Sequence, residues 1–167
     1  MIEYEAIKDY QLFPDSSSVW VYQADRKLSL DEQANIQQEM QAFTQQWSAH
    51  GKGLKASYGV LFETLLVLIV DLSQEAASGC SIDSSVHFIK ALGANYGFDA
   101  FNRNAIAYLK DNTIAFTNLQ NLDLAKGAQV FNVAVSNFGD FKEKLILNYE
   151  DSALSKLKID TSFTFSL

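Results

Sequence analysis

The segment LKASYGVLFETLLVLIVD, residues 54–71, decides the fold of this chain, because it holds two extended runs separated by a short turn. The runs cover residues 54–62 and 65–71, with the turn near Glu63. The second run is apolar at almost every position, so both of its faces are apolar, and strands of this kind are buried on both faces. We therefore expect it to lie centrally in a sheet that is covered on both sides, or on one side by a partner.

One helix is predicted before this hairpin and one after it. The first begins after Ser29, a good N-cap residue, and its apolar residues recur at helical spacing. That stripe consists of Ile36, Met40, Phe43 and Trp47. A loop of small and polar residues over 72–81 then leads into a second helix over 82–96.

Strands complete the pattern on either side of the helices. Residues 18–23 are aromatic and β-branched, which favours a strand. Residues 105–109 and 113–116 flank Asp111-Asn112, a two-residue hairpin signal. The order strand, helix, strand, strand, helix, strand is the β-α-β-β-α-β pattern of ferredoxin-like folds.

The last third of the chain predicts additions to this sheet. We expect a strand over 130–135, short helices over 138–145 and 152–158, and a terminal strand over 162–167, where apolar and polar residues alternate. The fold class is therefore α+β: a ferredoxin-like sheet with helices packed on it, extended by a C-terminal hairpin and short helices. No linker divides the chain, so residues 1–167 form one domain, with an N-terminal arm over 1–15.

Composition and charge exclude several kinds of partner. The net charge is −7, from 20 acidic against 13 basic residues, and only Arg26 and Arg103 are arginines. This balance argues against binding nucleic acid, which requires a basic surface, and against docking on an anionic membrane. The longest apolar run, Leu65 to Val70, is far shorter than the roughly 20 residues of a membrane span. The start lacks the pattern of a signal peptide, and a single cysteine excludes an internal disulfide, so we expect a cytoplasmic protein.

The segment SGCSIDSSVHFIK, residues 78–90, predicts a small-anion site in a binding or interaction module. It places the only cysteine at the start of the second helix, where unpaired backbone N–H groups and the helix dipole favour an anion. The predicted ligand-binding residues are Ser78, Gly79, Ser81, Asp83 and Ser84. Lys52, Lys55 or Arg103 could supply positive charge, whereas a carboxylate at Asp83 counts against anion binding unless it points away. The sheet could instead pair with a second copy to form a homo-oligomer.

The alternative is a thiol-dependent enzyme or redox sensor with Cys80 as the nucleophile and His50 or His87 as its base. Seven helical residues separate positions by about 10 Å along the axis, so a direct bond between Cys80 and His87 requires the loop to fold back. Asp83 and His87 lie one helical turn apart and could pair. A purely structural interpretation makes Cys80 a small buried residue, Ser81 a helix cap and Asp83 a first-turn acid.

Four segments resemble a family of small proteins from Bacteroidetes-type bacteria that are often labelled "ABC transporter ATPase". They are VWVYQ at 19–23, WSAHG at 47–51, LKAS at 54–57 and, above all, residues 78–90. The resemblance spans about residues 19–103, and it implies no catalytic residues. The family label would require a G-x-x-x-x-G-K-[ST] loop to hold phosphates and magnesium, and no such string occurs, so we exclude ATPase activity.

Other motifs of enzymes and cofactor sites are also missing. Position 86 is Val86, where a cysteine phosphatase with Cys80 as its nucleophile would need an arginine, and a thioredoxin-type site would need a second cysteine. The two histidines, one cysteine and scattered carboxylates show no metal-ligand spacing. We therefore expect no metal and no cofactor, and two classes remain: a binding or interaction protein and a thiol enzyme or sensor.

Overall fold

The computed structural model of the protein describes residues 4–157, and its centre is a three-stranded antiparallel sheet. The strand order is β1 (Ser18–Gln23), β5 (Leu65–Val70), β4 (Ala56–Leu61). Every residue of β5 is fully buried. The structure therefore confirms that the second run of the hairpin is the central strand. The turn before it places Phe62 and Glu63 in the left-handed region, with φ of 50° and 57°.

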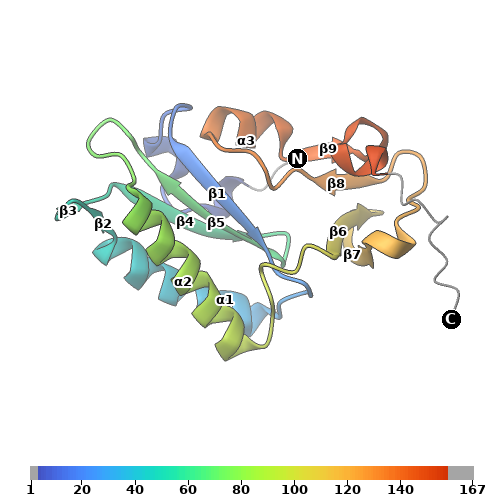
Figure 1. Cartoon of the computed structure of the whole chain (residues 1–167), viewed down its shortest axis with the longest axis horizontal. Coiled ribbons are helices and arrows are strands. Elements are labelled where there is room, and N and C mark those ends of the chain that lie inside the picture. The colour runs from blue at the N-terminus through green and yellow to red at the C-terminus, as the bar shows by residue number, and fades with distance from the viewer. Residues whose placement is uncertain (1–3, 158–167) are drawn as a thin grey trace, which may run out of the picture.

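Two helices, α1 (Leu30–Gln46) and α2 (Gly79–Tyr96), cover one face of this sheet (Figure 1). A capping box starts α1, because Ser29 accepts from the Glu32 N–H and the Glu32 carboxylate accepts from the Ser29 N–H. α2 ends at Gly97, whose φ of 75° suits a glycine C-cap. The core on this face consists of Ala24, Leu28, Ile36, Met40, Trp47, Ala49, Leu54, Val60, Leu66, Leu68, Val70, Ile89, Leu92 and Phe98.

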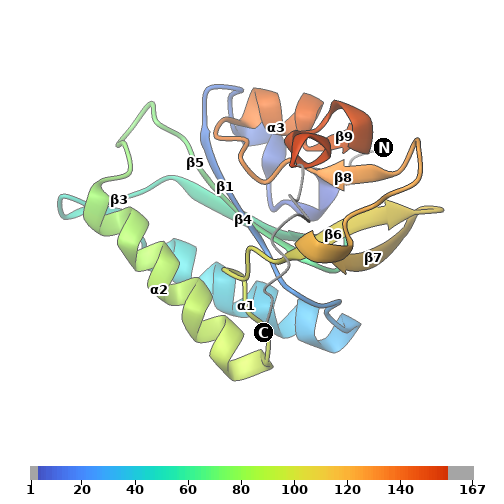
Figure 2. The ribbon, with the colours of Figure 1, turned by 45° about the vertical axis from the view of Figure 1, so that its right-hand side comes forward.

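The opposite face is covered by the N-terminal arm, by α3 (Phe138–Lys144) and by a second sheet (Figure 2). This four-stranded sheet is antiparallel, in the order β7 (Thr113–Asn118), β6 (Ala105–Lys110), β8 (Gln129–Phe131), β9 (Ile146–Asn148). The core here consists of Ile7, Phe13, Val19, Leu61, Leu65, Val67, Ile69, Ala107, Phe131, Val135, Phe138, Phe141 and Leu145. Both sides of the three-stranded sheet are thus covered by the chain itself.

Short elements complete the described chain. A small hairpin joins β2 (Ser48–Ala49) to β3 (Lys52–Gly53). Single 3₁₀ turns cover Tyr4–Ala6, Tyr10–Leu12, Leu119–Asn121, Tyr149–Asp151 and Ala153–Lys156. None of the helices within residues 4–157 combines the length and the apolar character needed to cross a membrane.

The N-terminal arm packs along the outer edge of β4. Ile7 forms a β-bridge with Gly59, and the Lys8 N–H donates to the Tyr58 carbonyl at 3.0 Å. The Ser57 hydroxyl donates to the Lys8 carbonyl. The Ile7 side chain is 1% exposed, so the arm is part of the core as well as a cover for the sheet edge.

The α+β class is confirmed, but a four-stranded ferredoxin-like sheet is not. The order β1-β5-β4 is the first-third-second part of that topology. In a ferredoxin-like sheet the fourth strand pairs with the first, whereas β6 pairs with β7 and β8 in the second sheet. The edge of β6 that could pair with β1 is taken by β8, which pairs with it at Tyr108 and Leu109, so β6 belongs to the second sheet.

Several boundaries in the second half differ from the predicted ones. Helix α2 begins at Gly79, three residues before the predicted start, because Ser78 rather than Ser81 is the N-cap. The predicted helix over 152–158 is the 3₁₀ turn Ala153–Lys156, and β9 was not predicted. The hairpin around Asp111-Asn112 is confirmed, with positive φ at both residues. The predicted strand over 162–167 lies outside the described residues.

Candidate functional site

The serine hydroxyls of the predicted anion site all bond within the start of α2. Ser78 Oγ accepts from the Ser81 N–H at 3.2 Å, Ser81 Oγ donates to the Ser78 carbonyl at 2.8 Å, and Ser84 Oγ donates to the Cys80 carbonyl at 2.9 Å. The Trp47 indole N–H donates to the Ser81 carbonyl at 2.8 Å. These contacts join α2 to the end of α1, so the segment has a clear structural role. Anion binding by Ser78, Gly79, Ser81, Asp83 and Ser84 stays a prediction.

The residues of the predicted thiol site are all exposed. Cys80 is exposed at the start of α2, so the buried-cysteine interpretation is wrong. His87 lies on the same helix, and His50 occupies the β2–β3 turn with a φ of 52°. Across residues 4–157, no hydrogen bond or ion pair joins Cys80 to either histidine or Asp83 to His87. No histidine is thus bonded to the thiol within the described residues, and a thiol site at Cys80 stays a prediction.

We expect Cys80 to react with iodoacetamide in the folded protein, because its side chain is exposed. Cys80→Ser should change the free energy of unfolding by less than about 0.5 kcal/mol, as for other surface substitutions. Mass spectrometry of the alkylated protein and urea unfolding of the variant measure the two quantities. Labelling that begins only when the protein unfolds would contradict this placement of the thiol.

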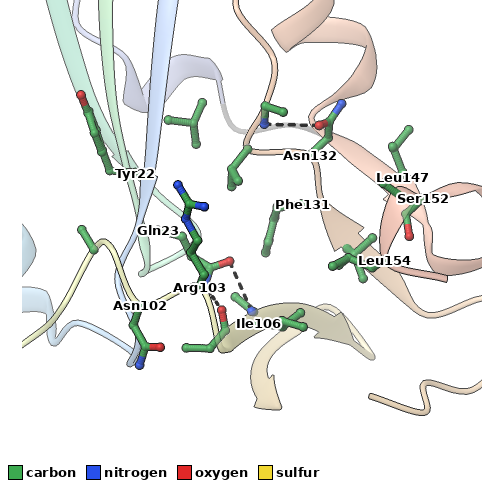
Figure 3. A pocket seen from close by; sticks show the side chains of 18 of the residues that line it. Tyr22, Gln23, Asn102, Arg103, Ile106, Phe131, Asn132, Leu147, Ser152 and Leu154 are labelled. Carbon is green, nitrogen blue, oxygen red and sulfur yellow. Dashed lines mark hydrogen bonds between the residues drawn. The ribbon is translucent and has the colours of Figure 1, made fainter. Parts of the chain in front are cut away.

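A pocket of about 940 Å³ lies between the outer edge of β1 and the four-stranded sheet (Figure 3). Its walls come from six separate stretches of sequence, and most of its lining is apolar. The lining consists of residues 21–23, 100–103, 105–107, 130–134, 147 and 152–154. The pocket thus lies beside the edge of β1 that β6 leaves open.

The backbone of Val21 faces this pocket. The Val19 N–H donates to the Ser136 carbonyl at 3.0 Å, so at Val19 the N–H points away from β5. N–H groups alternate in direction along a strand, which turns the N–H and C=O of Val21 to the same side. Within residues 4–157, no group hydrogen-bonds to either of them. Val21 therefore offers one donor and one acceptor at the pocket wall.

Gln23 closes the far end of this open edge with its side chain. Its amide nitrogen donates to the Ala105 carbonyl at 3.1 Å, and its amide oxygen accepts from the Ala107 N–H at 3.3 Å. The Gln23 side chain thus bonds to one C=O and one N–H of β6, as the backbone of a neighbouring strand would. The open edge is therefore confined to the stretch between Val19 and Gln23.

Arg103 is the cation of the pocket, and its guanidinium group extends into the open space that faces Phe131 in Figure 3. Within the described range, no carboxylate forms an ion pair with it, and it donates no hydrogen bond. An arginine fork without a carboxylate partner is suited to bind a planar anionic group.

The other arginine is fully occupied by the fold. Arg26 contacts both carboxylate oxygens of Glu32 at 2.6 and 2.9 Å, and it donates to the carbonyls of Lys27 and Gly97. The bonds that the Glu32 carboxylate accepts from Arg26 and from the Ser29 N–H lower the pKa of this carboxyl to about 2. The contrast between the two arginines, one engaged and one not, sets Arg103 apart.

Tyr22 belongs to the pocket wall, but its hydroxyl is directed elsewhere. It lies 3.2 Å from the Ser85 hydroxyl on α2, and burial raises the pKa of the phenol. Its ring packs against Phe101 with centroids 5.8 Å apart. Tyr22 therefore contributes an apolar surface and helps to hold the loop that carries Arg103.

Sequence analysis identified Arg103 only as one of three cations near an anion site and did not identify the pocket. No local signal marks a pocket whose walls come together from distant strands and loops. The scarcity of arginine was the one available indication, since an isolated arginine in an acidic chain is unusual enough to examine. Among residues 4–157, no group of His, Cys, Asp and Glu side chains is arranged to hold a metal ion.

The chain matches no protein-family model, no curated protein and no solved structure. The resemblance to the Bacteroidetes family therefore stays a prediction.

Proposed function

We propose that this chain is a binding protein whose pocket takes an elongated, mostly apolar molecule that carries a carboxylate or a similar anionic group. The observation that carries the proposal is Arg103, a cation without an ion pair in the described structure, at the wall of a largely apolar pocket. The volume of about 940 Å³ falls within the range of pockets that bind small molecules. This proposal keeps the predicted kind of protein, a binding module for an anionic ligand, but puts the ligand in this pocket and not at the start of α2.

Two kinds of contact would hold such a molecule. Apolar side chains, among them Ile106, Phe131 and Leu154, would remove its hydrocarbon part from water. The guanidinium group of Arg103 would pair with its anionic end, and the Val21 N–H offers a further donor. The net charge of −7 repels anions at long range, so recognition would depend on this local pair rather than on steering.

Decanoate is a suitable probe, and its uncharged analogue decanol is the matched ligand. We expect decanoate to bind and Arg103→Gln to weaken its binding at least about tenfold, because a hydrogen bond to a charged group is worth about 1.5 to 3 kcal/mol and 1.4 kcal/mol is tenfold in affinity. Decanol should bind both proteins equally. Isothermal titration calorimetry at pH 8, where the carboxylate is fully ionised, measures each affinity.

Lys110→Gln is the control variant, because it removes one positive charge at the exposed end of β6, away from the residues that line the pocket. It should leave both affinities unchanged. Equal loss of decanoate binding in Arg103→Gln and Lys110→Gln would show that only net charge matters. Absence of binding by both probes would reject the proposed ligand class.

A further inference from the structure

Backbone groups on the pocket wall distinguish between the kinds of anionic molecule that could bind there. Val21 presents one N–H and one C=O on the side of β1 that faces the pocket, and no group of residues 4–157 hydrogen-bonds to either. A purely hydrocarbon chain in the pocket would take both groups out of water without replacing their hydrogen bonds, which weakens binding. A ligand that carries its own N–H and C=O avoids this cost.

An extended peptide supplies both groups at once. In an antiparallel pair, two opposed residues exchange two N–H···O bonds, so one peptide residue opposite Val21 would satisfy its N–H and its C=O together. The chain already uses the same edge of β1 in this way. The Val19 N–H donates to the Ser136 carbonyl at 3.0 Å, and Ser18 and Asn137 form an antiparallel bridge. A bound peptide would continue this pairing along β1, which is strand addition at an exposed edge.

The free carboxylate at the end of a peptide matches the cation of the same pocket. The guanidinium group of Arg103 extends into the open space of the pocket (Figure 3), and it forms no ion pair with any carboxylate in the described part of the chain. A carboxylate can accept two parallel hydrogen bonds from a guanidinium group. The backbone of an internal peptide segment has no such group, so Arg103 favours the carboxyl end of a chain.

The rest of the lining suits the side chains of such a peptide. Ile106, Phe131 and Leu154 line the pocket, and two further lining residues, Phe101 and Val133, are 38% and 42% exposed. Apolar surface is therefore present for a ligand to cover. Alternate side chains of an extended chain point to the same face, so the last residue and the residue two before it can contact this surface together.

We propose that the pocket binds the carboxyl-terminal residues of an extended polypeptide, whose backbone pairs with β1 at Val21 and whose terminal carboxylate pairs with Arg103. This inference names the ligand of the proposed function and rests on it. Every polypeptide has the same backbone groups and the same terminal carboxylate. Selection between sequences would therefore depend on the two apolar side chains that reach the lining.

Isothermal titration calorimetry with the peptide acetyl-Thr-Val-Thr-Leu tests recognition of the chain end. We expect replacement of its carboxylate by an amide to weaken binding at least about tenfold, and Arg103→Gln to weaken binding of the acid as much, because both changes remove the same charged pair. The amide should bind the wild type and Arg103→Gln equally, and Lys110→Gln should bind the acid as the wild type does. Equal binding of acid and amide by the wild type would overturn the proposal.

Hydrogen exchange of the Val21 amide, measured by NMR, tests the backbone pairing. Saturation with the peptide should slow this exchange at least about tenfold, because a hydrogen bond protects the amide. Decanol is the matched ligand, since it enters the pocket without a peptide backbone, and it should have little effect. On the peptide side, N-methylation of the leucine or of the preceding threonine removes one donor, and at least one of these two changes should weaken binding about fivefold.

The outcomes separate this inference from the proposed function. Decanoate binding that depends on Arg103, without any peptide binding, would reject the peptide and leave the proposed function intact. Peptide binding with unchanged exchange at Val21 would overturn the strand pairing. Absence of binding by the peptide, decanoate and decanol would reject the proposed function as well. The same four residues at the carboxyl end of a carrier protein should bind as the peptide does, and loss of binding there would overturn recognition of a polypeptide tail.

Discussion

Leu68→Ala and Ile69→Ala are each expected to lower the free energy of unfolding by about 2 to 5 kcal/mol, the usual cost of truncating a fully buried Leu or Ile. The two residues are neighbours on β5, and their side chains point to opposite faces of the sheet. Leu68 belongs to the core under α1 and α2, and Ile69 belongs to the core under α3 and the arm. Both should be costly because both faces are buried, and either loss is a large part of a typical total stability of 5 to 15 kcal/mol.

Urea unfolding followed by circular dichroism measures these losses. Thr113→Ala serves as the control, since Thr113 is an exposed strand residue at the end of the β6–β7 hairpin, and it should change stability by less than about 0.5 kcal/mol. A large loss for Leu68→Ala with a negligible one for Ile69→Ala would mean that the second face of the sheet is solvated. The covering by the arm, α3 and the second sheet would then be wrong.

Gly59→Ala is the second substitution with a large expected effect, because the N-terminal arm passes directly over this residue. An added Cβ would lie 2.8 Å from the Ala6 carbonyl oxygen and 3.0 Å from the Ile7 Cα. Both are backbone atoms, so the arm itself must move. We expect a loss of about 1 to 3 kcal/mol, the usual cost of overpacking a filled site.

The same variant should release the arm, so that trypsin cleaves after Lys8 faster than in the wild type. Gly53→Ala is the matched control, since nothing lies within 4 Å of a Cβ at that position. It should match the wild type in both unfolding and cleavage. Unchanged cleavage in Gly59→Ala would show that the arm tolerates the added methyl group and that the contact is looser than described.

The elements with strong local patterns were predicted well from the sequence. The apolar run 65–70 predicted a central strand buried on both faces, and the spacing of Ile36, Met40 and Trp47 predicted a helix. The turn at Asp111-Asn112 was equally clear, because Asp and Asn adopt positive φ more readily than other residues except glycine.

The partner of β6 could not be predicted, because local pattern does not specify which strand a hairpin joins. Residues 105–110 are compatible with the edge of β1 and with β8, and the contact between Tyr108 and Val130 links segments more than twenty residues apart. The pocket exists because β6 pairs with β8 and not with β1, so the sequence did not predict it either. Only this pairing makes one pocket wall of residues as distant as Val21, Arg103 and Phe131.

The arrangement of the sheet edges also bears on whether copies of this chain can stack edge to edge. A strand as apolar as β5 would make its sheet a hazard if either edge were open, since unpaired edges template fibrils. The arm bonds to the edge of β4 through Ile7 and Lys8. On the β1 edge, Ser136 bonds to Val19 and the Gln23 side chain bonds to β6, so within residues 4–157 the outward backbone groups of Val21 and Gln23 are left without hydrogen bonds. An opening of two outward-facing residues offers few hydrogen bonds to a second strand, which makes it a poor start for a growing stack. The same geometry that leaves room for recognition therefore limits amyloid-like growth.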